Sequence, residues 1–123
     1  MTNREDTYES ESVKEHRRKW VKLKAKYLYA LPEEIAHIEL SLSKKDYAPA
    51  KKCAHRIKGT SATFGFGEIS RSAARLEQLA ASHCEQEYSG AVNEIMRLVE
   101  HEIRLLDFQR SPDLDRNERD ANG

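Results

Sequence analysis

The stretch that decides the fold is YAPAKKCAHRIKGTSATFG, residues 47–65. On a helical wheel at 100° per residue, its small and apolar side chains fall within an arc of about 100°, and these are Tyr47, Ala50, Ala54, Ile57, Ser61 and Phe64. Asp46 is a favourable N-cap residue directly before the stretch, and Gly65 supplies a stop signal at its end. The pattern predicts a helix from Tyr47 to about Gly65 with one face in a protein core.

The sequence around this stretch, between residues 12 and 108, shows helical periodicity and no sustained alternation typical of strands. Further helices are expected over residues 12–29, 32–43, 68–82 and 88–108. The helix over residues 32–43 is expected to begin at Pro32, a position where the missing N–H costs nothing. Helices of this length joined by short loops pack as antiparallel neighbours. The sequence therefore predicts an all-α, up-and-down antiparallel four-helix bundle with an additional N-terminal helix.

The chain is expected to divide into three segments. Residues 1–11 are expected to form a flexible N-terminus and residues 109–123 a flexible C-terminal tail, because neither end has enough apolar residues to pack. Residues 12–108 are expected to form the helical bundle. A chain of 123 residues with 38% hydrophobic residues fits one such domain.

Composition also bears on location and on the cysteines. No apolar stretch approaches the roughly 20 residues that a membrane helix needs, and the first residues, MTNREDTYESES, lack the apolar segment of a secretory signal. A cytoplasmic location is therefore expected. Cys53 and Cys84 have no CxxC spacing, which favours reduced structural thiols over a disulfide or a zinc site.

The net charge of zero hides two basic segments. Residues 13–30 contain seven Lys and Arg against one acid, and residues 44–58 contain six against one. Residues 59–108 hold four Arg against eight acids. Such segregation calls for a local explanation, for example a phosphate or the acidic surface of a partner.

His55 lies away from the core face of the helix predicted over residues 47–65, so its imidazole is expected to face solvent. A neutral imidazole is a competent nucleophile and can accept a phosphoryl group. Lys58 and Lys51, each about one turn away, are placed to stabilise charge on that group. Glycine inside a helix costs about 0.5 to 1 kcal/mol relative to alanine. Gly59 therefore indicates a need for clearance beside the ring, where another protein's active site can approach.

The competing interpretation is that His55 is ordinary surface, because an exposed histidine among lysines usually has no special role. The other histidines are assigned to that class, namely His16, His37, His83 and His101. His55 differs from them because it is combined with Gly59, with the small residues Ser61 and Ala62, and with local positive charge.

The run AHRIKGTSATFG, residues 54–65, resembles the signature of histidine phosphotransfer (HPt) domains, in which HxxKG is followed by small residues and by a second glycine. The proline-containing stretch Leu31-Pro32-Glu33, the linker Lys45-Asp46-Tyr47 and the run Ala74-Arg75-Leu76-Glu77 also fit the family pattern. The resemblance covers about residues 17–108. The lysine-rich segment at the start of the bundle is a departure that the motif does not explain.

By this resemblance His55 accepts the phosphoryl group, Lys58 is the cation beside it, and Gly59 is the gap that admits the partner. Members of the family are monomeric helical bundles that carry phosphoryl groups between receiver-domain aspartates in phosphorelays, without ATPase activity of their own. The resemblance implies a phosphocarrier that is charged by a receiver domain or a hybrid sensor histidine kinase. It then passes the group to a response regulator.

The remaining site residues follow from the same argument. The chain has no cluster of acids around His55, so no intrinsic cofactor is expected, and the receiver domain is expected to supply Mg²⁺. Lys51 and Lys52 are expected to steer an acidic partner. Clearance or docking surface is expected from Gly59, Lys52, Ser61 and Ala62, with Ile38 and Leu42 where they emerge. Structural roles are expected for Gly65, Pro32 and Asp46.

Two alternatives remain open at the level of sequence. The same bundle can serve as a non-catalytic docking module that binds receiver domains without being phosphorylated. The basic segment over residues 13–30 can contact nucleic acid through its cations, with Trp20 and Tyr27 beside them. Zero net charge and the absence of a recognised nucleic-acid motif weigh against the second alternative.

Overall fold

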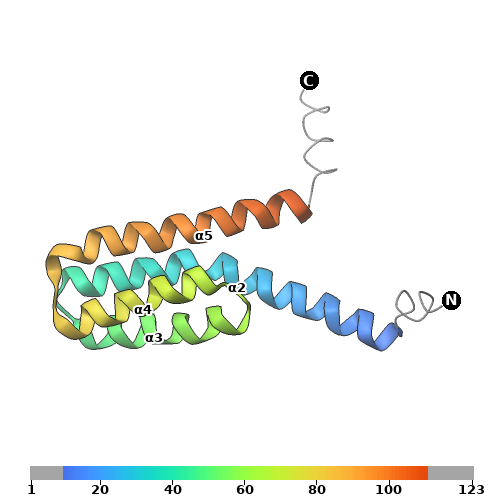
Figure 1. Cartoon of the computed structure of the whole chain (residues 1–123), viewed down its shortest axis with the longest axis horizontal. Helices are drawn as coiled ribbons and strands as arrows, with labels where there is room; N and C mark the ends of the chain where they lie inside the picture. The colour runs from blue at the N-terminus through green and yellow to red at the C-terminus, as the bar shows by residue number, and fades with distance from the viewer. Residues whose placement is uncertain (1–9, 111–123) are drawn as a thin grey trace, which may run out of the picture.

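The computed structural model describes residues 10–110, and its helices are labelled as in Figure 1. They are α2 (Glu11–Ser43), α3 (Tyr47–Thr63), α4 (Gly67–Ser82), the short 3-10 helix η1 (Glu85–Glu87) and α5 (Tyr88–Arg110). The helices run in alternating directions; α2 and α4 each pack against both α3 and α5. The described residues contain no strand, and the prediction of an all-α antiparallel bundle is confirmed. The ends predicted to be flexible, residues 1–11 and 109–123, fall almost entirely outside the described residues.

The prediction of a separate N-terminal helix was wrong, because α2 continues through Pro32 without a break. The side chains of Leu28, Leu31 and Ile35 are buried in the same core on both sides of the proline. A proline inside a helix removes one backbone hydrogen bond and tends to bend the helix. Figure 1 shows the N-terminal part of α2 leaving the bundle at an angle to the rest. The helix therefore stays continuous because residues on both sides of Pro32 are buried in one core, although proline by itself favours a helix boundary.

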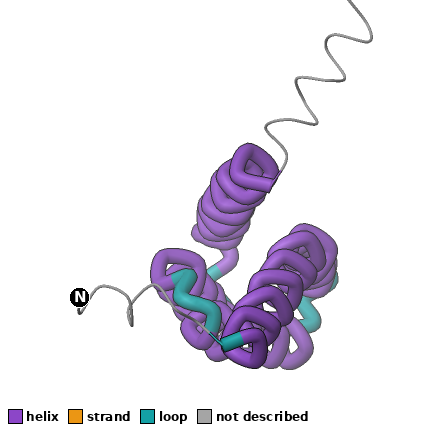
Figure 2. The backbone as a smooth tube through the Cα atoms, turned by 90° about the vertical axis from the view of Figure 1, so that its right-hand side faces the viewer, coloured by secondary structure: helices purple, strands orange, loops and turns teal. Residues whose placement is uncertain are grey.

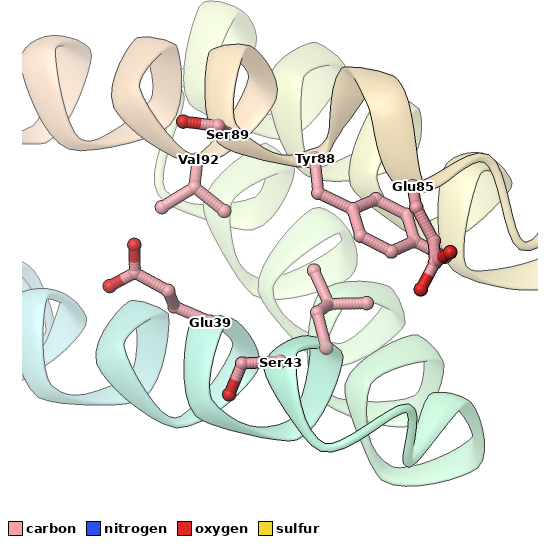
Figure 3. Close-up of a pocket in the computed structure, with 7 residues that line it drawn as sticks. Glu39, Ser43, Glu85, Tyr88, Ser89 and Val92 are labelled. Atoms are coloured by element: carbon pink, nitrogen blue, oxygen red, sulfur yellow. The ribbon is translucent and has the colours of Figure 1, made fainter.

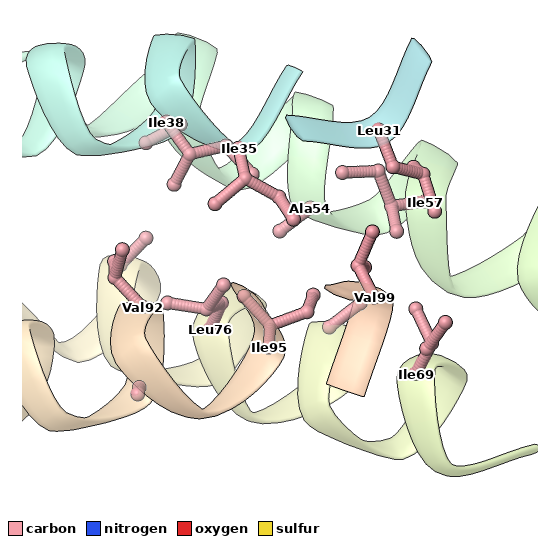
Figure 4. Close-up of a cluster of buried hydrophobic side chains, with 14 of the residues drawn as sticks. Leu31, Ile35, Ile38, Ala54, Ile57, Ile69, Leu76, Val92, Ile95 and Val99 are labelled. Atoms are coloured by element: carbon pink, nitrogen blue, oxygen red, sulfur yellow. The ribbon is translucent and has the colours of Figure 1, made fainter. Parts of the chain in front are cut away.

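The core is aliphatic and draws on all four long helices. Viewed from the side in Figure 2, the helices surround a common centre. Burying one large aliphatic side chain stabilises a fold by about 1.5 to 3 kcal/mol, so these contacts hold the bundle together. The labelled side chains that meet there in Figure 4 are Leu31, Ile35, Ile38, Ala54, Ile57, Ile69, Leu76, Val92, Ile95 and Val99.

A three-residue turn joins α3 to α4 and sets which residues of the two helices face each other. Gly65 adopts a φ of 85°, a left-handed conformation that suits glycine, and the Phe66 amide donates to the Ser61 carbonyl at 2.8 Å. Helix α3 thus ends at Thr63, two residues before the predicted end. Asp46 occupies the predicted N-cap position, although its side chain makes no capping hydrogen bond.

Among the described residues, no helix is both long enough and apolar enough to cross a membrane.

Cys53 and Cys84 are free thiols, as predicted, and both are half-buried. Burial raises the pKa of the Cys53 thiol, which keeps it protonated at neutral pH. The cysteines therefore contribute packing and no cross-link within the described part of the chain.

Candidate functional site

His55 projects from the outer face of α3, and 66% of its side chain is exposed to solvent. Its neighbours Ala54 and Ile57 are buried in the bundle and fix the orientation of the helix. The predicted core face is confirmed for Ala50, Ala54, Ile57 and Ser61. The ring therefore stands on a rigid helix with one side open to an approaching molecule.

Glu77 of α4 links His55 to Lys58 through one carboxylate. Its Oε2 lies 2.7 Å from Nδ1 of His55, and its Oε1 accepts a hydrogen bond of 2.8 Å from Nζ of Lys58. The Glu77 side chain is only 18% exposed, so the carboxylate sits between the two helices. The three side chains thus form a single connected group across the α3–α4 interface.

The hydrogen bond from Lys58, followed by that from His55, lowers the pKa of the Glu77 carboxyl below its usual value, although desolvation opposes this shift. Glu77 is therefore ionised at neutral pH. An ionised carboxylate can only accept hydrogen bonds, so the proton of its bond to His55 is on Nδ1. In the neutral ring this leaves the Nε2 lone pair free and directed away from Glu77.

Gly59, one turn beyond His55, opens space beside the ring. A Cβ atom placed at Gly59 meets no other atom within 4 Å. The glycine is thus not required by packing within the described chain. Ala62 is also exposed on α3, and its small side chain adds little bulk to this side of the helix.

Hydrogen bonds from the neighbouring helices hold α3 in place beneath His55. Tyr27 of α2 donates to the carbonyl of Ile57 at 3.3 Å, and its hydroxyl shares a bond of 2.8 Å with that of Ser61. Ser70 of α4 donates to the carbonyl of Lys58 at 2.8 Å. Because Ser61 is fully buried, the prediction that it contacts a partner was wrong; its role is to anchor Tyr27.

The remaining predicted docking residues divide into two groups. Lys51 and Lys52 are exposed on α3, with no hydrogen bond or ion pair to another residue within the range 10–110. Ile38 and Leu42 are buried, so the prediction that they emerge beside His55 was wrong. Arg56 is held on the same outer face by a 2.9 Å ion pair with Glu34 of α2.

The other histidines are exposed, as predicted, and none joins the group around His55. These are His16, His37, His83 and His101. His83 is stacked on Tyr47 with ring centroids 3.9 Å apart, near the turn between α4 and η1. Their surroundings are those of ordinary surface residues.

Glu77 is the site residue that the sequence argument missed. From the sequence alone, Glu77 was identified only as part of the run Ala74-Arg75-Leu76-Glu77, which fits the family pattern. A signal was present, because residues 55 and 77 are equally far in sequence from Phe66, the last residue of the α3–α4 turn. Two antiparallel helices joined by so short a turn bring such residues level with each other. Using that signal requires the turn to be located first.

A pocket of about 300 Å³ lies elsewhere, between the end of α2 and the start of α5 (Figure 3). Of the residues predicted for the site or its docking surface, only Leu42, which is buried, lines it. Its lining consists of Glu39, Leu42, Ser43, Glu85, Tyr88, Ser89 and Val92. Because 66% of the His55 side chain is exposed, the group around it forms an open surface, which suits a protein partner better than a small substrate.

Comparison with known families adds an independent finding: the sequence matches the model of the Hpt domain over residues 22–108. The chain belongs to the Hpt domain family. Hpt domains take part in histidine phosphotransfer within phosphorelays and work with receiver domains of response regulators. Comparisons with curated proteins and with solved structures found no match. The family match begins at Lys22, so the first eleven residues of α2 lie outside it.

Proposed function

We propose that this Hpt domain accepts a phosphoryl group on Nε2 of His55 from a receiver-domain aspartate and passes it to a response regulator. The observation that carries the proposal is the exposed ring whose Nδ1 donates to Glu77. This bond fixes the tautomer and leaves Nε2 as the nucleophilic atom facing solvent. A hybrid sensor histidine kinase carrying a receiver domain is an equally suitable donor.

The transfer step follows from this arrangement. The Nε2 lone pair forms a bond to phosphorus while the bond from phosphorus to the aspartyl oxygen breaks, and the aspartate leaves as a carboxylate. The ring then carries a proton on Nδ1 and phosphorus on Nε2, and it gains positive charge. The Glu77 carboxylate, 2.7 Å from Nδ1, offsets that charge. Transfer to the next receiver is the reverse of this step.

Lys58 contributes to the same step from the other side of Glu77. Its ammonium group has three N–H donors, and one of them is used by the bond to Glu77. The other two are available to the oxygens of the transferred group. Lys51, about one turn before His55 and exposed, adds positive charge there.

Docking is assigned to the outer face of α3. Gly59 and Ala62 allow the receiver's active site to approach the ring, and Lys51 and Lys52 attract its acidic surface. We expect the receiver domain to bring the Mg²⁺ that phosphoryl transfer requires. We also expect the Hpt protein to act as a monomer in the cytoplasm.

The test is transfer of label from a receiver domain charged with radioactive acyl phosphate, in the presence of Mg²⁺. Wild type should acquire acid-labile, alkali-stable phosphate, and His55→Gln should acquire none while keeping its helical circular dichroism. His37→Gln is the matched control, because His37 is also exposed but lies on α2 away from Glu77. Label on His55→Gln would overturn the assignment. Binding of receivers without any labelling of wild type would favour the docking-module alternative.

A further inference from the structure

A second cleft, of about 360 Å³, lies between α4 and α5 and is lined by arginines from both helices. Arg71 and Arg75 are one turn apart on α4, and Arg97 faces them from α5. Glu68 and Glu94 also line the cleft, so its side chains carry one net positive charge. This feature plays no part in the function proposed above.

Ser72 lies in the lining of this cleft and is 92% buried, since only 8% of the residue is exposed. Its hydroxyl oxygen has no hydrogen-bond partner, although it is shielded from solvent. A buried polar group without a partner destabilises a fold, and such groups are uncommon in native proteins. The orphaned hydroxyl indicates that its partner is a molecule that the bundle binds.

The arginines around Ser72 are unequally engaged. Arg75 is held by Glu87 at 3.0 Å and by Glu94 at 3.5 Å. Arg71 has only a loose contact of 3.8 Å with Glu68, and both side chains are about three quarters exposed. Arg97 makes no ion pair or hydrogen bond with another side chain of residues 10–110. The guanidinium groups of Arg71 and Arg97 are therefore able to turn towards a ligand in the cleft.

The chemistry of this lining matches a phosphate group. Guanidinium forks bind phosphate oxygens with two parallel hydrogen bonds, and a serine hydroxyl adds another donor. The cleft is larger than a phosphate ion alone requires, and half-buried Leu98 provides an apolar surface for the remainder of a ligand. A small phosphorylated metabolite of nucleotide size fits both properties.

The cleft is separate from the group around His55. Glu77 follows Arg75 by two residues, so the two side chains leave α4 in directions about 200° apart. One faces α3 and His55, whereas the other lines the cleft with α5. Occupation of the cleft therefore leaves the outer face of α3 open.

We propose that the α4–α5 cleft binds the phosphate group of a small phosphorylated metabolite. The Ser72 hydroxyl donates to one phosphate oxygen, and Arg71 and Arg97 bind the others. Arg75 keeps Glu94 engaged and away from the anion. The proposal does not depend on phosphorylation of His55.

Isothermal titration calorimetry with inorganic phosphate, AMP and adenosine tests the proposal. Phosphate and AMP should bind with one site per chain, AMP more tightly, and adenosine should not bind. Ser72→Ala and Arg97→Gln should each weaken AMP binding at least five-fold. Arg104→Gln, an exposed arginine two turns further along α5, and Lys58→Gln, next to His55, should leave it unchanged.

The thermal stability of Ser72→Ala separates a binding role from a purely structural one. Without ligand this variant should melt a few degrees above wild type, because an unsatisfied hydroxyl is removed. With AMP it should gain less stability than wild type does. Absence of AMP binding to wild type, or equal binding by wild type and both cleft variants, would overturn the proposal.

Discussion

At the scale of single residues, Glu77 makes the stability of the bundle depend on pH. Its pKa is lowered in the folded protein, first by the hydrogen bond from Lys58 and then by that from His55. A carboxyl with a lowered folded pKa contributes stability above its unfolded pKa. That contribution is lost as the pH falls through the folded value. The loss of unfolding free energy at acidic pH is therefore expected to depend in part on Glu77.

We expect Glu77→Gln to be less stable than wild type by about 1 kcal/mol at pH 7, because Lys58 and His55 lose a charged acceptor. The difference should shrink as the pH falls through the lowered pKa of the Glu77 carboxyl, where the wild-type side chain takes up its proton. Thermal unfolding between pH 7 and pH 3 measures this. Glu100→Gln, an exposed acid of α5, should follow wild type throughout. A deficit that stays constant with pH would contradict the expectation.

Gly59→Ala should separate stability from transfer. Alanine meets no atom within 4 Å there, so the helix should gain about 0.5 to 1 kcal/mol. Phosphotransfer should nevertheless become slower, and Gly59→Leu should slow it further, because the added atoms stand where the receiver approaches. Urea denaturation and rapid-quench transfer give the two readouts. Gly90→Ala, at another open helical position, should add stability without slowing transfer.

The sequence was sufficient to place His55 on an exposed face, because one helix with a clear apolar side settles that question. It was not sufficient for Glu77 or Ser61. The role of Glu77 depends on which residues α3 and α4 bring together. Ser61 had the right size for a docking surface, yet its hydroxyl is used inside the bundle by Tyr27.

At the scale of elements, α2 shows where local signals fail. The pair Leu31-Pro32 indicates a helix boundary when only neighbouring residues are considered. The structure keeps one helix, because apolar residues on both sides of Pro32 share the core. The bounds of α4 and α5, by contrast, were predicted to within two residues, since no proline interrupts their periodic pattern.

Pro32→Ala should stabilise the bundle by on the order of 1 to 2 kcal/mol. The restored amide can donate within α2. This gain exceeds the extra entropic cost of folding a chain that is more flexible when unfolded. Urea denaturation measures the change. Pro49→Ala is the matched control, because Pro49 lies in the first turn of α3, where its missing N–H costs little. Equal effects of the two substitutions would contradict this account of α2.

At the scale of the whole molecule, the N-terminal part of α2 is an extension to the family domain. The family match begins at Lys22, and the first buried side chain of α2 is that of Ala25. Trp20 already contacts the bundle, with its ring centroid 4.8 Å from that of Phe64. The cations before it are exposed, and they are Lys14, Arg17, Arg18 and Lys19.

Removal of residues 1–18 should leave a bundle that unfolds cooperatively, with a melting temperature within a few degrees of wild type. Of the deleted residues, those that the structure describes, 10–18, are all exposed. Circular dichroism measures the transition, and tryptophan fluorescence shows whether Trp20 stays packed on Phe64. Loss of cooperative unfolding would show that the extension belongs to the folding unit. Salt-dependent binding of nucleic acid, compared between wild type and the truncated protein, tests the alternative that the basic segment contacts nucleic acid.

The length of α2 has a hydrodynamic consequence. At 1.5 Å per residue, its 33 residues span about 50 Å, and part of that length extends past the globular bundle. A particle of this shape tumbles more slowly about its short axes than about its long one. It should therefore elute from a gel-filtration column ahead of a sphere of 14.2 kDa. Early elution alone is thus compatible with a single chain, and sedimentation equilibrium is the measurement that counts its copies.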